Sequence, residues 1–260
     1  MKQGLLFFFI LIYFITAAQE TIDIHGMDCG MHGSAKYNSR SWKLDEYKNR
    51  YQFPSASDFD TSISLESLSA SADPNGFDMD KAVVLRGYVF NVKTGGVETC
   101  NCKTTDPQYR DTHIELVPDE NHTQAQYRLI VEVTPRLRLY MADRGEDWST
   151  PALKQKLIGH KVEISGWLFY DAEHETGSFA NDPDDVIGQK NWRASCWEVH
   201  PITHLQLADH GYSSFQTSID QQKSTSTPAA TKVKSHAWII VVLVLVVLFF
   251  VFAFQKGNRK

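Results

Sequence analysis

Apolar and polar residues alternate along five stretches in the middle of the chain, which is the pattern of strands that bury one face. These stretches are 83–92, 110–117, 127–134, 162–170 and a part of 192–207. Gly87 inside the first stretch predicts a bend or a bulge. Ser149 and Thr150 stand before Pro151, so a short helix over 151–157 is predicted between the third and the fourth strand.

Five strands with one short helix between the third and the fourth predict a mainly β fold, an OB-like Greek-key barrel. We place this barrel at 82–208. Residues 19–81 carry few periodic apolar positions and predict an irregular N-terminal arm with a short helix within 42–51. Residues 209–236 are rich in Ser, Thr and Gln, which predicts a flexible linker.

Both ends of the chain carry apolar runs that predict where the protein is located in the cell. Residues 1–18 have the apolar run and small residues of a signal peptide, although an uncleaved anchor is the alternative. Residues 237–254 are long and apolar enough for a transmembrane helix, with a buried core helix as the alternative. The basic residues 255–260 would form a cytoplasmic tail. We therefore expect a single-pass membrane protein whose N-terminal domain is exported.

Four cysteines bear on the oxidation state of an exported chain: Cys29, Cys100, Cys102 and Cys196. Outside the cytoplasm such cysteines favour disulfides. Cys100 and Cys102 are too close in sequence to bond each other without strain, so we expect Cys29 to bond one of the two. The alternative is a metal bound by Cys100 and Cys102, although zinc motifs usually place two to four residues between cysteines.

The second strand carries a row of chemically active side chains, Asp111, His113 and Glu115. Because side chains alternate across a strand, this row lies opposite Thr112, Ile114 and Leu116, which we place inside the barrel. The plain interpretation is an outward, water-exposed face with cross-strand ion pairs such as Glu115 with Arg128. The alternative is a catalytic site at Asp111, His113 and Glu115.

Neighbouring strands add further ligand types to this face. Glu132 lies on the third strand and His200, after Glu198, on the last. Imidazole and carboxylate groups are zinc ligands, so His113, Glu115, Glu132 and His200 are candidate ligands of zinc or another divalent metal. That site exists only if the barrel brings these side chains together. No other cofactor is predicted.

Charge and missing motifs exclude several classes of function. The chain has a net charge of −5, which disfavours nucleic acid as a partner, because a nucleic-acid groove is basic. The sequence contains no Gly-x-Ser-x-Gly, no His-Glu-x-x-His and no Gly-rich phosphate loop. With 42% hydrophobic residues, the chain has enough apolar residues for a core.

Three segments carry a resemblance to known sequences: Gly-Gly-Val-Glu-Thr-Cys-Asn-Cys at 95–102, Asp-Thr-His-Ile-Glu-Leu at 111–116, and 191–201 with Asn-Trp-Arg and Trp-Glu-Val-His-Pro. They are similar to segments of uncharacterised exported bacterial proteins with an OB-like barrel. The resemblance spans about 29–207, including Lys48, Asn49 and Arg50. It implies the fold and the export, and it carries over no catalytic residue.

Two functions follow from these patterns. The first is a membrane-anchored, extracytoplasmic binding or scaffolding module whose partner is an unknown protein or small molecule. The alternative is a metal-dependent hydrolase or nuclease-like enzyme that uses the His and carboxylate cluster on the barrel. The enzyme is favoured if the side chains converge around a concavity. It is disfavoured if they point away from one another on a convex face.

Overall fold

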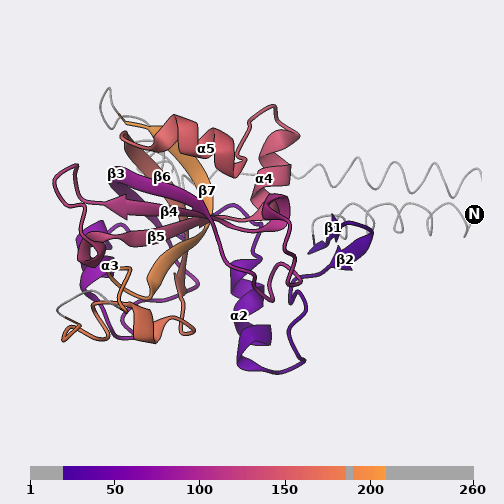
Figure 1. The fold of residues 1–260 in the computed structure, drawn as a ribbon, viewed down its shortest axis with the longest axis horizontal. Helices are drawn as coiled ribbons and strands as arrows, with labels where there is room; N and C mark the ends of the chain where they lie inside the picture. Colours follow the sequence, from indigo (N-terminus) through magenta and orange to yellow (C-terminus); the bar gives the residue numbers. More distant parts are fainter. Residues whose placement is uncertain (1–19, 186–189, 209–260) are drawn as a thin grey trace, which may run out of the picture. The chain divides into compact units, whose positions relative to one another are not determined.

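Five strands form a closed barrel in a computed structural model that describes residues 20–185 and 190–208. The barrel strands are β3 (Ala82–Thr94), β4 (Thr112–Val117), β5 (Leu129–Val133), β6 (Lys161–Tyr170) and β7 (Trp197–Leu207). The barrel lies beside helix α2 (Arg40–Lys48), while α5 (Thr150–Leu157) crosses one side of it (Figure 1). The structure therefore confirms a mainly β chain with a five-stranded barrel.

The order of the strands around the barrel is β3-β4-β5-β7-β6. Every neighbouring pair is antiparallel except β5 and β7, which run parallel. In the register, His113 pairs with Glu132 across β4 and β5, and Ile130 pairs with Glu198 across β5 and β7. This order puts β5 between β4 and β7, so polar side chains from three strands share one outer face.

The helices differ from the prediction at one place between the third and the fourth strand. The predicted helix is present as α5, with Ser149 as its N-cap. A second helix precedes it, α4 (Pro135–Ala142), with Thr134 as its N-cap. Pro135 has no N–H to lose at the start of a helix, so it begins α4 as well as ending β5. The predicted helix over 151–157 is therefore confirmed, and α4 is an additional helix that was not predicted.

The N-terminal arm contains more regular structure than its sequence indicates. Besides α2, it holds a hairpin of β1 (Ile22–Ile24) and β2 (Met27–Cys29) and a short helix α3 (Leu65–Ala70). Ser39 caps α2, and Ser64 forms a capping box with Ser67 at α3. Helix α2 overlaps the short helix predicted within 42–51, whereas β1, β2 and α3 are too short to show an apolar period and were not predicted.

The interior of the barrel is apolar, as the alternation predicts. Ile114 and Leu116 of β4 are fully buried together with Val131, Leu168 and Val199 of the neighbouring strands. Gly87 does not form the predicted bulge, because the register of β3 shifts between Val89 and Asn91. A Cβ at Gly87 would lie 2.7 Å from the carbonyl oxygen of Val117, so glycine is needed there for close strand contact.

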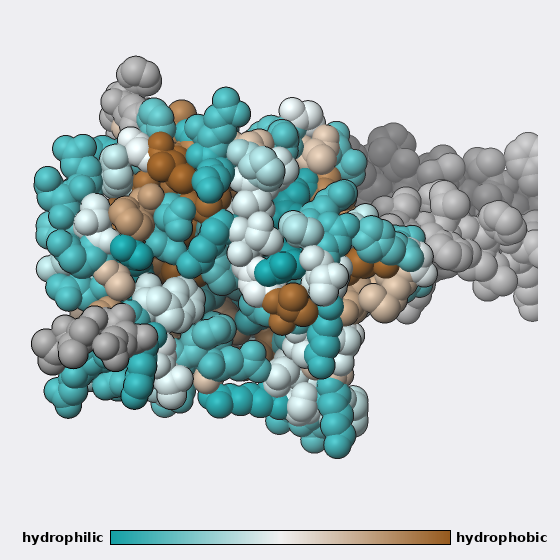
Figure 2. Space-filling view, in the orientation of Figure 1, coloured by the Kyte–Doolittle hydropathy of each residue, from teal (hydrophilic) through white to brown (hydrophobic). Residues whose placement is uncertain are grey.

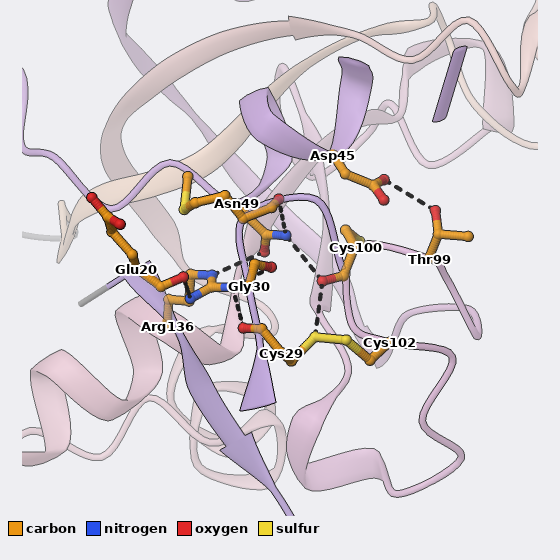
Figure 3. Close-up of a disulfide and its surroundings, with 10 residues drawn as sticks. Glu20, Cys29, Gly30, Asp45, Asn49, Thr99, Cys100, Cys102 and Arg136 are labelled. Carbon is orange, nitrogen blue, oxygen red and sulfur yellow. Dashed lines mark hydrogen bonds between the residues drawn. A yellow bond between two sulfur atoms is a disulfide. The ribbon is translucent and has the colours of Figure 1, made fainter. Parts of the chain in front are cut away.

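A disulfide between Cys29 and Cys102 joins the arm to the loop after β3, which confirms that Cys29 bonds one of the two nearby cysteines (Figure 3). The guanidinium of Arg136, at the start of α4, donates to the carbonyl oxygens of Cys29 and Gly30. The same guanidinium donates to the side chain of Asn49 at the end of α2. One arginine therefore links the hairpin, α2 and α4.

The predicted signal peptide, linker and transmembrane segment lie outside the described residues. Within residues 20–185 and 190–208, no helix is long and apolar enough to cross a membrane. Hydrophilic side chains cover most of the face that Figure 2 shows, with hydrophobic side chains in small patches.

Candidate functional site

The outer face of β4 is buried, which corrects the expectation of a water-exposed row. The exposed fractions are 2% for Asp111, 8% for His113 and 2% for Glu115. On the two neighbouring strands, Glu132 and His200 are also buried. Buried ionisable groups must find partners or change their protonation state, because desolvation disfavours charge. This polar face is therefore the candidate site.

Four segments lie over this face, and we call them the cover. They are residues 40–49, the loop 95–103, and the segments 171–185 and 190–196 that follow β6. Lys48 at the end of α2 contacts the ring of Phe169, which in turn contacts His200. Asn49 donates to the carbonyl oxygen of Cys100, which ties α2 to the loop. The cover turns an outer barrel face into a buried one.

Glu132 lies at the centre of the site, between the two histidines. Its Oε1 is 2.9 Å from Nε2 of His113, and its Oε2 is 3.5 Å from Nδ1 of His200. The same Nδ1 of His200 lies 3.4 Å from Oε2 of Glu198. The side chains of β4, β5 and β7 therefore do converge. We call Asp111, His113, Glu132, Glu198 and His200 the carboxylate–imidazole cluster.

Asp111 enters the cluster from the residue before β4. Its Oδ2 accepts a hydrogen bond of 2.8 Å from Asn101 and lies 3.8 Å from the thiol of Cys100. Its Oδ1 is buried and has no hydrogen-bond partner within the part of the chain that the structure describes. One oxygen of this carboxylate is thus held in place, and the other is left free to face the cluster.

Two permanent cations stand at the edges of the cluster. Lys48 binds Glu98 at 2.5 Å, and Arg193 binds Glu198 at 2.6 Å. Arg193 also lies 3.3 Å from Asp171, which contacts His174. Both cations are buried and are directed to carboxylates of the rim. Neither forms an ion pair with Asp111 or Glu132 among the contacts of the described residues.

Glu115 does not join the cluster, although it shares the row with Asp111 and His113. Its carboxylate lies 2.7 Å from Nζ of Lys93 and 3.5 Å from the guanidinium of Arg128. Asn91 adds a hydrogen bond of 3.4 Å. The predicted ion pair of Glu115 with Arg128 is therefore present, and the charge of Glu115 is balanced locally.

The electrostatics of the cluster follow from burial and close contact. Burial raises the pKa of Asp111 to about 6, and Glu132 and Glu98 act in the same direction. Burial alone would lower the pKa of His113, but the carboxylate of Glu132 reverses the shift and raises it to about 9. The pKa of His200 is raised for the same reason, against the effect of its burial. In the absence of another cation, imidazolium groups therefore supply positive charge here.

A cleft of about 620 Å³ opens beside the cluster. Its walls come from the end of β3, the loop 95–103, the start of α2 and the segments after β6. Glu98 and His113 line it, so they connect the cleft with the buried cluster. A Cβ at Gly95 would lie 2.7 Å from Nε2 of His113, so glycine lets this wall approach the imidazole.

Two groups of side chains are close enough to hold a metal ion among the described residues. Asp111, Glu132 and His200 form one group, in which ligand atoms lie within 4.8 Å of one another. Glu98, Cys100 and Asp111 form the other under the same limit. Cys100 and Cys102 do not form a pair of metal ligands, because Cys102 is in the disulfide.

Several residues of the site were not found from the sequence: Lys48, Glu98, Asn101, Asp171 and Arg193. All lie in the cover, where neither a strand nor a helix period marks which side chain points inward. Lys48, Glu98, Asn101 and Arg193 belong to segments that carry the resemblance, but the resemblance assigns them no role. The sequence offered one signal for these residues, namely a charged or amide residue next to a Cys or a Trp. Examples are Cys-Asn-Cys at 100–102 and Trp-Arg at 192–193.

Comparison with family models, with curated proteins and with solved structures finds no match to this chain. The site is therefore interpreted from its own geometry.

Proposed function

We propose that the chain is an exported binding module that takes a small anionic ligand in the cleft beside the cluster. The observation that carries this proposal is the charge of the cleft lining. Five basic side chains line it: Lys93, Lys103, Arg110, His113 and His174. Only two acidic side chains do so, Glu98 and Glu173. A basic concavity on a chain of net charge −5 attracts and concentrates anions locally.

The details of the lining support a small ligand. Lys48 neutralises Glu98 from behind, so the floor of the cleft is not left negative. Arg110 donates to the carbonyl oxygens of Gly95 and Gly96, which fixes the wall formed by that loop. Trp192 adds a half-buried aromatic side chain at the rim. A fixed wall, an aromatic side and convergent polar groups are the usual parts of a small-molecule site.

The strand order supports an OB-like barrel as the framework of this site. In that fold, ligands bind on the face of the second and third strands, between the loop joining strands one and two and the loop joining strands four and five. Here the second strand is β4, the first loop is 95–111, and the described parts of the other loop are 171–185 and 190–196. The cleft is lined by His113 and by residues of both loops. Its position thus agrees with the position that the fold favours.

An exported, membrane-anchored location is part of the proposal. It rests on the apolar runs at 1–18 and 237–254, which lie outside the described residues. The disulfide Cys29–Cys102 supports it, since such bonds persist in oxidising compartments. In this arrangement the cleft faces the outside of the cell, and the tail 255–260 faces the cytoplasm.

The alternative function, a metal-dependent hydrolase, is favoured by one observation, namely that Asp111 and His113 reach the same cluster. Glu115, the third catalytic candidate, is held by Lys93 and Arg128 instead. A catalytic metal must be reached by its substrate, whereas Asp111, Glu132 and His200 are all buried and do not line the cleft. The binding module therefore fits the geometry better.

Isothermal titration of the full chain in detergent with inorganic phosphate and with citrate tests the proposed function. We expect the Lys93→Gln/Lys103→Gln variant to lose affinity by about tenfold, which corresponds to about 1.4 kcal/mol. The matched control is Lys156→Gln, an exposed lysine of α5 outside the cleft. Absence of binding by both probes, or an equal loss in the control, would refute an anion site in the cleft.

A further inference from the structure

The carboxylate–imidazole cluster contains ligand atoms that the ion pairs of the rim leave unused. Asp111, Glu132 and His200 have exposed fractions of 2%, 3% and 0%. Buried polar atoms are almost always hydrogen-bonded, and each exception needs an explanation. Among the described residues, Oδ1 of Asp111 and Nε2 of His200 have no hydrogen-bond partner, and Oε2 of Glu132 has only the ion-pair contact of 3.5 Å with Nδ1 of His200. These unpartnered atoms belong to one group whose ligand atoms lie within 4.8 Å of one another.

The charge of the cluster points in the same direction. Glu98, Asp111, Glu132, Asp171 and Glu198 bring five carboxylates, and the two permanent cations are Lys48 and Arg193. The carboxylates therefore outnumber the permanent cations in this buried site. Lys48 is committed to Glu98, and Arg193 to Glu198 and Asp171. The remaining carboxylates, Asp111 and Glu132, are those that face His200.

Each of the three residues is oriented by a neighbour that leaves one ligand atom free. Asn101 holds Oδ2 of Asp111, and His113 holds Oε1 of Glu132. Glu198 lies 3.4 Å from Nδ1 of His200, where a carboxylate can fix the imidazole tautomer. Partners that hold one atom of a ligand and direct the other are a common feature of protein metal sites.

We propose that one divalent transition-metal ion of the zinc class binds between Asp111, Glu132 and His200. Two carboxylates and one imidazole suit Zn²⁺ or Mn²⁺, whereas Ca²⁺ requires six or more oxygen ligands. The three ligands do not line the cleft, so this site is separate from the proposed anion site. The three buried ligands come from the residue before β4, from β5 and from β7, so the ion would join these strands beneath the cover.

The site also explains why the cover is tied down so firmly. Asn101 and the disulfide partner Cys102 are in the same loop, one residue apart. The disulfide and the bond from Asn49 to the carbonyl oxygen of Cys100 both fix the loop that orients Asp111. A loop that must present Asn101 to a metal ligand has to be positioned closely, because ligand orientation sets affinity.

Zinc titration of the full chain in detergent, after removal of metals with a chelator, tests this inference. We expect stoichiometric binding of Zn²⁺, with Mn²⁺ as the second probe. Asp111→Asn, Glu132→Gln and His200→Gln should each weaken binding by on the order of 100-fold. Glu115→Gln is the matched control, because Glu115 is equally buried in the same row but is balanced by Lys93 and Arg128.

Melting of the wild-type chain gives an independent readout if a variant fails to fold. Saturating Zn²⁺ should raise the melting temperature by roughly 5–10 °C, and chelator should reverse the rise. If the imidazolium groups already balance the charge, Zn²⁺ will neither bind nor stabilise, and the inference is overturned. It is also overturned if binding survives all three ligand variants but is lost in His25→Gln/His32→Gln, because the ion then sits on the N-terminal arm.

Discussion

The two faces of β4 are equally buried and are held by different forces. Ile114 and Leu116 point into an apolar barrel, where their burial is itself stabilising. His113 and Glu115 point outward beneath the cover, where burial costs free energy unless each charge finds a partner. The inner face would serve any barrel of this shape. The outer face needs a particular set of partners, so function is to be sought there.

Within the outer face, the two ends of the row differ again. Glu115 has two cations close by, whereas Asp111 has an amide and a thiol. The first end is a closed set of ion pairs. At the Asp111 end, no Lys or Arg among the described residues forms an ion pair with the carboxylate, which is one basis of the proposed metal site. The predictions below compare three kinds of buried side chain: apolar side chains, charged side chains with an ion-pair partner, and charged side chains without one.

Removal of Arg193 should have the largest effect. Arg193→Met leaves Glu198 and Asp171 buried without their shared cation, so the free energy of unfolding should fall by about 4 kcal/mol. Urea denaturation measures the change. The matched control is Arg40→Met, whose ion pair with Glu175 is exposed and whose loss should cost at most about 1 kcal/mol. Equal losses in the two variants would contradict the account.

Removal of the disulfide should have the next largest effect. Cys29 and Cys102 are 73 residues apart, and a cross-link of this length stabilises by about 4 kcal/mol through the unfolded state. Cys29→Ser/Cys102→Ser should therefore lower the midpoint of urea denaturation. It should also weaken zinc binding, because the disulfide fixes the loop that carries Asn101. If a folded variant keeps its zinc affinity, the metal site does not depend on the disulfide that holds the cover.

A cavity in the apolar face should destabilise without touching the site. Ile114→Ala is expected to cost about 3 kcal/mol of unfolding free energy, because a fully buried side chain is truncated. Its zinc affinity per folded chain should equal that of the wild type. Ile114→Val, with a cost of about 1 kcal/mol, provides the graded control. A loss of zinc binding in these variants would show that the two faces are coupled.

Asp45 is a buried carboxylate that is not one of the proposed metal ligands, and its ionisation is disfavoured by burial. Burial raises its pKa from 3.8 to about 6, while the hydrogen bond from Thr99 and the charge of Lys48 lower it, and Glu98 and Glu173 add repulsion. Since the folded state binds this proton more tightly than the unfolded state, ionisation costs stability, and the cost is full above pH 6.

Asp45→Asn should therefore stabilise the chain by about 1–2 kcal/mol at pH 7. The gain should shrink as the pH falls through 6 and vanish near pH 4, where Asp45 of the folded wild type is already protonated. Urea denaturation at both pH values measures this. A gain that does not change with pH would mean that the charge of Asp45 is not its cause.

The sequence predicted the barrel well because alternation is a local signal that repeats over several residues. Ile114 and Leu116 are inside, as expected from their spacing in the second strand. The arm elements β1, β2 and α3 were missed because they are too short to show a period. Helix α4 was missed because Pro135 was taken only as the end of a strand. A proline can end one element and begin the next, and the sequence does not distinguish these cases.

Of the candidate site, only the residues on or next to strands were singled out from the sequence. Asp111, His113, Glu132 and His200 follow from strand positions, and the barrel brings them to one face. Burial of that face was not predictable, since Lys48 and Arg193 come from segments that are distant in the sequence and have no period. The position of Glu115, close to the others in sequence but paired elsewhere, likewise depends on Lys93 and Arg128.

The most direct test of the account is elemental analysis of the full chain, purified without chelator and then dialysed against metal-free buffer. The account predicts one zinc-class ion per chain in the wild type and in Glu115→Gln, and a loss of that ion in Asp111→Asn and Glu132→Gln. A wild-type chain that is free of transition metal, and that takes up none when Zn²⁺ is added, would contradict the central claim that the outer face of β4, β5 and β7 is a metal site.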